Sequence, residues 1–411
     1  MGKIKSKMNV LFLTDEYYPR FGANSLVVKN LCAEFVNEGH EVYVAPFSYD
    51  DTMPSEETYE GVHIHRGVPR DDKKAIVNCV KRLRLIKAFR LFCKWFAQKV
   101  TKRDKLSLKR QICAPDYIEN IIKDKHIDVV VSICCSVELS FPLLELRKKG
   151  RLGAKWIFYM IDPFESHSYY RGIESVDTLR RIQHDIMLNA DEVVATSLIY
   201  RDTEAWESNE ILAKITKIEF PKVTRPHLAP ASDDIPLEIG KINVVCTGTK
   251  NELVRNSNYT LALIDHMSSE NVVFHMVGNG WCESDRVEGN VRYYTPRSHQ
   301  AIVNMQSNAD FLLNIGNVVT NQLPSKVLEY ISTGRPIVNV AKSTTCPTVE
   351  LLANYDSLTI MESEDIDLAS ERLGEYLLAT HPQSEYVTIQ DKYKPYTPKY
   401  VAQQFLEIMR G

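Results

Sequence analysis

Residues 310–341 read DFLLNIGNVVTNQLPSKVLEYISTGRPIVNVA and predict a strand, a helix and a second strand. The apolar run Phe311–Ile315 forms the first predicted strand, and residues 337–340 form the second. Pro324 opens the helix and Gly334 ends it, which is the usual asymmetry of helix boundaries. The stretch therefore predicts a βαβ unit, and with it a parallel sheet covered by helices.

The first turns of this helix carry the polar side chains of Ser325, Lys326 and Glu329. A helix start presents free backbone N–H groups, which together with a hydroxyl and an ammonium favour an anion such as phosphate. Glu329 lies one turn further along, where it would meet hydroxyl groups attached to that phosphate. The pattern predicts a nucleoside diphosphate site, although geometry alone leaves open an ordinary βαβ unit whose polar residues face water.

A longer run of matches extends this local pattern. Residues 324–338 resemble the donor-binding helix of the GT-B-fold, retaining nucleotide-sugar glycosyltransferases, namely family 4 and its relatives. The family signature P-S-K-x-x-E-Y-x-x-x-G-[KR]-P-[IV]-V is matched by Pro324, Ser325, Lys326, Glu329, Tyr330, Gly334, Arg335, Pro336, Ile337 and Val338. The resemblance implies an α/β chain with the GT-B fold, in which two Rossmann-like domains face each other across a cleft.

Strand-like and helical segments alternate along the whole chain, which predicts parallel α/β sheets. The expected strands are residues 9–14, 41–46, 129–133, 156–161, 192–196 and 217–220, then 243–247, 271–277, 291–294, 311–315, 337–340 and 357–360. The two series fit the two domains of the GT-B plan, with ligand bound at the carboxyl ends of the strands.

A Pro-rich stretch without periodicity separates the two series of strands. We predict an N-terminal, acceptor-side domain at residues 1–221, a linker at 222–240 and a donor-binding domain at 241–395. The last segment, 396–411, is amphipathic, and in the resembling family the final helix packs back on the N-terminal domain. A helix that stays on its own domain is the alternative.

The start of the second series, CTGTKNELVRNSNYTLAL at residues 246–263, resembles the first strand and glycine turn of the family's donor domain. The resemblance implies that Gly248 and Thr249 approach the diphosphate and that Arg255 neutralises it. Arg255 and Lys326 are candidate catalytic residues, because together they would offset the charge of the leaving diphosphate. We therefore expect no metal and no cofactor besides the nucleotide-sugar co-substrate.

A later loop of the same domain lies beside the nucleotide base in the family. Its counterparts here are Tyr294, Thr295, Pro296 and Arg297, which we take as candidate base contacts. Packing of the tyrosine within the domain is nearly as well supported as stacking on the base.

The loop before the predicted helix departs from the family pattern. Family members often carry an acidic residue eight positions before the one that corresponds to Glu329, whereas this chain has Asn321 there. Gln322 and Leu323 follow, and all three are candidate donor contacts. Amides bind sugar hydroxyls but cannot stabilise developing positive charge as a carboxylate does, so the donor sugar stays open and catalytic competence is in question.

The opening stretch, residues 9–42, resembles the family's first strand, glycine loop and helix. Gly22 stands at the loop glycine, where the lack of a side chain lets a ligand approach the backbone. Ala23 replaces the second glycine of the family pattern. Gly22 is thus a candidate donor contact, although a lone glycine also fits an ordinary turn.

The acceptor side is less well marked. The family often has a histidine after the strand that residues 128–133 resemble, but this chain continues SICCSVEL. Glu138 and Asp162 are the candidate catalytic carboxylates on this side, with His167 as a third possibility. Each of these residues also fits a structural role such as a helix cap.

Bulk composition limits the class of protein. The chain has 411 residues, 44% of them apolar and 25% charged, as in a soluble protein of two or three domains. A net charge of −3 argues against nucleic-acid binding. The nine cysteines are scattered without a C-x-x-C pair, and no apolar run has the length of a signal peptide or a membrane span. We expect a cytoplasmic protein with free thiols.

One charged stretch stands apart. Between Lys81 and Arg110, about a dozen Lys or Arg residues alternate with aliphatic and aromatic residues, and Asp104 is the single acid. A basic amphipathic helix of this kind is typical of a peripheral membrane segment on an anionic surface. A solvated face over a buried stripe is the alternative.

The leading hypothesis is a retaining, metal-independent glycosyltransferase of the hexosyltransferase class that acts in polysaccharide biosynthesis. It would move a sugar from a nucleotide diphosphate donor to a glycan or lipid-linked acceptor. Two alternatives stay open: a non-hydrolysing nucleotide-sugar epimerase of the same fold, and a non-catalytic GT-B module that binds a nucleotide or a partner.

Overall fold

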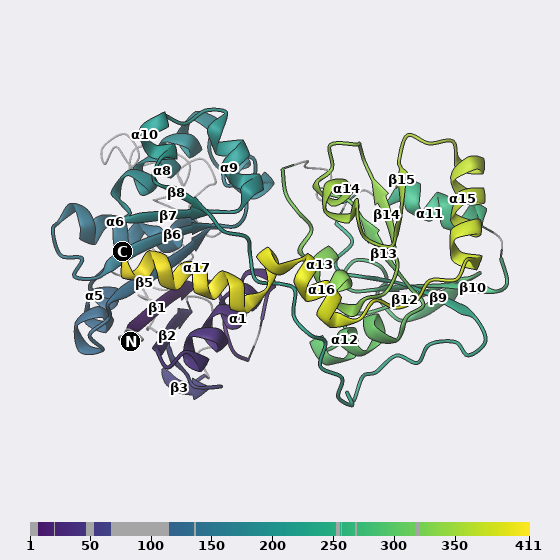
Figure 1. Cartoon of the computed structure of the whole chain (residues 1–411), viewed down its shortest axis with the longest axis horizontal. Helices are drawn as coiled ribbons and strands as arrows, with labels where there is room; N and C mark the ends of the chain where they lie inside the picture. Colours follow the sequence, from purple (N-terminus) through teal and green to yellow (C-terminus); the bar gives the residue numbers. More distant parts are fainter. Residues whose placement is uncertain are drawn as a thin grey trace, which may run out of the picture. The chain divides into compact units, whose positions relative to one another are not determined.

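The computed structural model describes residues 7–19, 21–46, 53–66, 115–134, 137–251, 255, 257–267, 269–317 and 321–411. The chain divides into two compact units (Figure 1): unit 1 comprises Met1–Pro221 and Pro398–Gly411, and unit 2 comprises Lys222–Thr397. The chain therefore passes between the units twice. The basic stretch between Lys81 and Arg110 lies outside the described residues.

Unit 1 is built on one parallel sheet, with the strand order β3-β4-β2-β1-β5-β6-β7-β8 among its described residues. Only β3 runs antiparallel, against β4. The strands are β1 (Asn9–Thr14), β2 (Glu41–Pro46), β3 (Glu56–Tyr59), β4 (Val62–His65), β5 (Val129–Cys134), β6 (Lys155–Met160), β7 (Glu192–Ala195) and β8 (Ile215–Lys217). The helices are α1 (Ala23–Asn37), α5 (Pro115–Asp124), η1 (Val137–Ser140), α6 (Phe141–Lys148), α7 (Ser168–Arg171), α8 (Val176–Asn189), α9 (Ser197–Glu204), α10 (Asn209–Leu212) and α17 (Pro398–Arg410).

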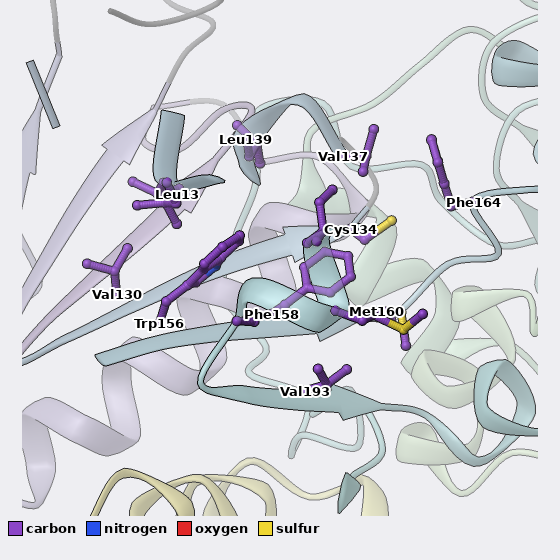
Figure 2. Close-up of a cluster of buried hydrophobic side chains, with 14 of the residues drawn as sticks. Leu13, Val130, Cys134, Val137, Leu139, Trp156, Phe158, Met160, Phe164 and Val193 are labelled. Atoms are coloured by element: carbon purple, nitrogen blue, oxygen red, sulfur yellow. The ribbon is translucent and has the colours of Figure 1, made fainter. Parts of the chain in front are cut away.

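The core of unit 1 follows from the alternation of side chains along its strands. Trp156, Phe158 and Met160 are two residues apart on β6, so they point to one face of the sheet. Figure 2 shows them in a cluster with Leu13 of β1 and Val193 of β7, and all five are buried. The central strands are buried on both faces, which explains why they read as continuous apolar runs instead of alternating ones.

The C-terminal helix α17 belongs to unit 1 (Figure 1). The ring of Phe405 meets that of Tyr159 edge-on, with 5.0 Å between centroids. Lys155 also donates to the carbonyl of Ile408 at 2.6 Å. Val401, Phe405 and Met409 are buried, so the apolar stripe of this amphipathic segment is used within unit 1.

Unit 2 repeats the design, with the strand order β11-β12-β10-β9-β13-β14-β15 and only β11 antiparallel in its described part. The strands are β9 (Ile242–Thr247), β10 (Val272–Val277), β11 (Arg286–Glu288), β12 (Val291–Tyr294), β13 (Phe311–Ile315), β14 (Ile337–Ala341) and β15 (Ser357–Met361). The helices are α11 (Asn258–His266), α12 (His299–Asn308), α13 (Ser325–Thr333), α14 (Pro347–Leu352), α15 (Ile366–Leu378), α16 (Tyr386–Lys392) and η2 (Lys394–Tyr396).

Both sheets share one topology once the antiparallel edge strand is set aside. The first six parallel strands of each unit, numbered in chain order, lie in the order 3-2-1-4-5-6, which is that of the doubly wound dinucleotide-binding fold. In such a sheet the order reverses beside strand 1, and ligands bind outside the carboxyl ends of the strands at that point. The switch point lies between β1 and β5 in unit 1, and between β9 and β13 in unit 2.

Most predicted strands are present to within one residue, but two differences have physical causes. The hairpin of β3 and β4 is missing from the prediction; its turn residues Glu60 and Gly61 have φ of 50° and 78°, as a type I′ turn requires. The strand predicted at 217–220 lies at Ile215–Lys217, because the chain leaves the sheet before Phe220. Both elements lie towards an edge of the sheet, where the apolar pattern is weak.

The stretch predicted as a linker, 222–240, contains no helix or strand but is packed within unit 2. The backbone N–H groups of Lys222 and Val223 both donate to the carbonyl of Tyr396 at 3.0 Å. Asp233 accepts hydrogen bonds from the backbone and hydroxyl of Ser298 at the start of α12. The stretch is therefore held in place along its length.

Candidate functional site

A small hollow lies at the switch point of unit 2. Its walls come from the residues that follow β9, from β13 and from the start of α13, with Trp281 on one side. Four of the predicted donor residues line it, namely Gly248, Thr249, Arg255 and Lys326, and the first and last of these are 78 positions apart in sequence.

The backbone at Gly248 has a φ of +127°, which side-chain-bearing residues rarely adopt. A Cβ there would lie 3.2 Å from Nη1 of Arg255 and 4.0 Å from Cγ of Lys326. The glycine therefore lets both cationic side chains lie against the backbone. Gly278, with a φ of +137°, packs so closely that a Cβ would come within 2.4 Å of the Gly248 carbonyl oxygen.

Arg255 is held by Asn317, a residue that no sequence motif marks. Its Nε donates to Oδ1 of Asn317 at 3.1 Å, and Nδ2 of Asn317 donates in turn to the Gln322 carbonyl at 3.2 Å. Asn317 is buried two positions after β13. Its position just after the carboxyl end of a strand beside the switch point is the feature by which the sequence could have identified it as a site residue.

Tyr330 connects α13 to the end of β9. Its hydroxyl accepts a hydrogen bond from the backbone N–H of Thr247 at 2.7 Å, and the side chain is fully buried. Burial raises the pKa of this phenol above its ordinary value. The tyrosine of the signature thus fixes α13 against the end of β9.

Glu329 is contacted by two lysines. Nζ of Lys326 lies 2.6 Å from Oε2, and Nζ of Lys222 lies 3.3 Å from Oε1. Burial would raise the pKa of Glu329, but the charges of Lys326 and Lys222 outweigh it and lower the pKa to about 2. Glu329 is therefore a carboxylate at neutral pH and can accept hydrogen bonds but not donate them.

Lys222 is the second residue that sequence reasoning missed. Its side chain is 3% exposed, and burial lowers its pKa, against the opposing effect of the Glu329 carboxylate. It stands in the stretch predicted as a linker, where no local pattern marks it. A single lysine outside any motif cannot be recognised as a site residue from one sequence.

The base-loop candidates make contacts of their own. The backbone and hydroxyl of Thr295 each donate to Oδ1 of Asp285 at 2.9 Å, and Arg297 forms an ion pair with the same carboxylate. The ring of Tyr294 is parallel to that of His275, with 6.0 Å between centroids. Pro296 is exposed. The loop is thus a pre-shaped element held by Asp285, a residue that no sequence motif marks.

The remaining donor candidates surround the start of α13. Ser325 is the first residue of the helix, and Asn321, Gln322 and Leu323 are half-buried in the loop before it. Thr249, after the glycine turn, is exposed.

The candidates of unit 1 follow the carboxyl ends of its strands. Gly22 precedes α1 in the connection from β1, and a Cβ there would come within 2.3 Å of Oε1 of Glu16. Glu138 lies in η1 after β5, fully buried, and accepts a hydrogen bond from the Tyr170 hydroxyl at 2.7 Å. Asp162, after β6, is half-buried. Asp162 is therefore the more accessible of the two carboxylates.

Two kinds of feature are absent from the described ranges, a metal-binding cluster and a membrane-spanning helix. No three or more His, Cys, Asp or Glu side chains there are grouped so that they could hold a metal ion. Likewise, none of the helices described has both the length and the apolar character needed to cross a membrane.

No protein-family model matches the chain, and no curated protein matches it in sequence. Among solved structures, a sucrose-phosphate synthase from Thermosynechococcus elongatus matches with a TM-score of 0.63 and 12% identity over 98% of both chains. WaaG, a glycosyltransferase involved in lipopolysaccharide biosynthesis, matches with a TM-score of 0.54 and 13% identity over 98% of this chain and 100% of its own. A trehalose-6-phosphate protein from E. coli, bound with UDP-2-fluoro glucose, matches with a TM-score of 0.61 and 9% identity over 98% and 99%.

Likeness at these identities is evidence for the fold. Each match spans nearly the whole of both chains, and the strand order agrees with two Rossmann-like units. The chain has the α/β GT-B fold, and the fold predicted from the sequence is confirmed.

Proposed function

We propose that this protein is a glycosyltransferase that moves a sugar from a nucleoside diphosphate donor to a glycan or lipid-linked acceptor. The observation that carries the proposal is the pair of cations, Arg255 and Lys326, placed against the Gly248 backbone at the switch point of unit 2. Phosphate oxygens are the ligand that this combination of a guanidinium, an ammonium and a helix start favours.

The same pair supplies the chemistry that sugar transfer needs. As the bond between sugar and phosphate breaks, negative charge builds on the departing diphosphate, and fixed cations beside it lower the energy of that transition state. The Nε–H of Arg255 donates a hydrogen bond to Asn317. This bond fixes the plane of the guanidinium, and Nη1 lies beside Gly248. With two cations present, we propose that transfer proceeds without a metal.

Glu329 supports a nucleotide donor in particular. Its carboxylate lies one turn after Ser325 and is ionised, so it can accept hydrogen bonds from the two ribose hydroxyls. A simple phosphate ester would leave this acceptor unused.

For the acceptor side we propose unit 1, with Gly22 and Asp162 as its contacts and Glu138 as a buried supporting carboxylate. Retention of the anomeric configuration is part of the proposal: the leaving diphosphate would take the proton of the incoming hydroxyl on the same face of the sugar. We also propose that the protein works in the cytoplasm, on the membrane surface that the residues between Lys81 and Arg110 would contact.

Two of the similar structures support the choice of substrates. The E. coli protein was solved with UDP-2-fluoro glucose, a nucleotide sugar, and WaaG takes part in lipopolysaccharide biosynthesis. The donor proposed here, a nucleotide sugar, is of the same kind as the ligand of the E. coli protein. The proposed glycan or lipid-linked acceptor is of the kind that lipopolysaccharide biosynthesis uses.

The deciding experiment measures release of nucleoside diphosphate when the protein is mixed with UDP-, GDP- or ADP-sugars and a panel of glycan acceptors. We expect acceptor-dependent release that survives EDTA and is lost in Lys326→Ala. Isomerisation of the nucleotide sugar without release would identify an epimerase instead. Nucleotide binding without any turnover would identify a binding module, and loss of activity in EDTA with rescue by Mg²⁺ would overturn the metal-free mechanism.

A further inference from the structure

Lys222 is a buried lysine whose ammonium meets one carboxylate. Its Nζ lies 3.3 Å from Oε1 of Glu329, while Lys326 takes the other oxygen, Oε2, at 2.6 Å. The side chains differ in exposure: 3% for Lys222, 15% for Glu329 and 24% for Lys326. Glu329 thus has one partner deep in the protein and one partner facing the hollow.

The backbone of Lys222 is as fixed as its side chain. Lys222 and Val223 donate to the Tyr396 carbonyl at 3.0 Å, and the Val223 carbonyl accepts from the Tyr386 hydroxyl at 3.3 Å. Val223 itself is fully buried. These contacts fix the backbone at Lys222, and its side chain is buried beside Glu329, unlike that of a surface lysine.

A buried ion pair of this kind is weak evidence for a role in stability. Replacing such a pair by apolar residues is often neutral or stabilising, because each buried charge has lost its hydration. Lys326 has a different task in the proposed function, since it faces the diphosphate. Any movement of its ammonium towards phosphate would take one partner from Glu329 and leave Lys222 as the other.

We propose that Lys222 is a positioning residue, which holds the Glu329 carboxylate in place to receive the ribose hydroxyls of the bound nucleotide while Lys326 serves the diphosphate. The inference rests on the proposed nucleotide-sugar site. The charged or titratable groups that act on Glu329 are Lys222 from the 222–240 stretch, Lys326 from α13 itself and His299 from α12. Of these, Lys222 is the one that is fully buried.

Isothermal titration with UDP, GDP and ADP tests the proposal, followed by the 2′,3′-dideoxy form of whichever binds most tightly. In Lys222→Met we expect the nucleoside diphosphate to bind about tenfold more weakly at pH 7.5, the equivalent of 1.4 kcal/mol. The loss should disappear with the dideoxy ligand, which has no ribose hydroxyls to offer. It should also disappear in a Glu329→Gln background, because Lys222 acts through the Glu329 charge.

The pH profile provides a second readout. Removing one of two lysines while burial remains raises the pKa of Glu329, so as the pH is lowered the affinity of Lys222→Met should begin to fall at a higher pH than that of the wild type. Titration of the phosphate occurs in both proteins and cancels when their affinities are compared. Arg372→Met is the matched control, since it removes a cation from an ion pair with Glu364 elsewhere in unit 2 and should leave binding unchanged.

Thermal unfolding checks that each variant is folded, and Lys222→Gln replaces Lys222→Met if the latter is not. Absence of nucleotide binding in the wild type would refute the proposed function itself. A wild type that binds, with a Lys222 variant of equal affinity and pH profile, would overturn the inference alone. A loss that is the same for the dideoxy ligand, or that persists in Glu329→Gln, would also overturn it, because the effect would then be structural.

Discussion

The ammonium of Lys326 lies 2.6 Å from Oε2 of Glu329, one turn along α13. The sequence predicts separate partners for these side chains, the diphosphate for the lysine and the hydroxyl groups attached to it for the glutamate. Their contact means that a bound diphosphate has to share the lysine with Glu329 or take it away. The two halves of the proposed nucleotide site are therefore coupled through one ion pair.

Loss of either cation should weaken diphosphate binding far more than nucleoside binding. We expect Arg255→Ala and Lys326→Ala each to lose roughly 1.5–3 kcal/mol for the nucleoside diphosphate, as for a charge-assisted hydrogen bond. Titration calorimetry with nucleoside and nucleoside diphosphate measures this. Lys241→Ala, before the opposite end of β9, is the control. Equal losses for both ligands would show that the cations act through folding.

Glu329→Gln should weaken binding of any ligand that carries the ribose hydroxyls, because an amide is a poorer acceptor than a carboxylate. The expected loss is roughly 1.5–3 kcal/mol, measured by titration of the nucleoside and of its diphosphate. Unchanged affinity for both would exclude a ribose contact.

The same substitution should change how stability depends on pH. The pKa of Glu329 is about 2 in the folded protein, against an ordinary value of 4.5, so the folded state holds this proton less well than the unfolded chain. Its contribution, up to about 3 kcal/mol, is complete above about pH 4.5 and is lost as the pH falls to about 2. Urea unfolding at several pH values should find Glu329→Gln less stable than the wild type at pH 7. The difference should shrink below pH 4.5, and a constant difference would contradict the assignment.

Gly278→Ala should destabilise unit 2, since the new Cβ would lie 2.4 Å from the Gly248 carbonyl oxygen at a φ of +137°. The strain amounts to roughly 1–3 kcal/mol or more and should also disturb diphosphate binding by displacing Gly248. Gly374→Ala is the matched control, because this helical glycine of α15 has no neighbour within 4 Å of an added Cβ. Alanine there should stabilise by up to about 1 kcal/mol. Equal melting temperatures for the two variants would refute the close-packing argument.

The basic stretch between Lys81 and Arg110 should bind anionic vesicles, and the binding should weaken as salt is added. Changing Lys87, Arg90 and Lys94 to Glu should abolish co-sedimentation with anionic vesicles and leave nucleotide affinity intact. This prediction comes from the sequence alone, because the stretch lies outside the described residues. Persistent co-sedimentation of the triple variant would identify a solvated face instead.

Local patterns predicted the secondary structure of unit 2 around the site. Pro324 and Gly334 flank α13 in the structure as they do in the prediction, because proline pre-sets φ for a helix start and glycine readily adopts the left-handed φ of 72° at the helix end. The buried strand Phe311–Ile315 was equally clear, because a strand covered on both faces is apolar at every position. The hairpin of β3 and β4 was missed, since short edge strands carry little apolar signal.

The residues of the candidate site also fall into those that the sequence marks and those that only the tertiary structure reveals. The sequence by itself determined the α/β class and the bounds of α13, because local apolar patterns and helix-end residues carry that information. The helix pattern marked Lys326 and Glu329 as candidate site residues, and the family resemblance added Gly248 and Arg255. Only the tertiary structure decided that Asn317 holds Arg255, that Asp285 holds the base loop and that Lys222 holds Glu329. Lys222 and Glu329 are 107 positions apart in the sequence, and their contact depends on how the chain returns to α13. No local pattern encodes such a meeting, because burial and charge pairing act on distances in space.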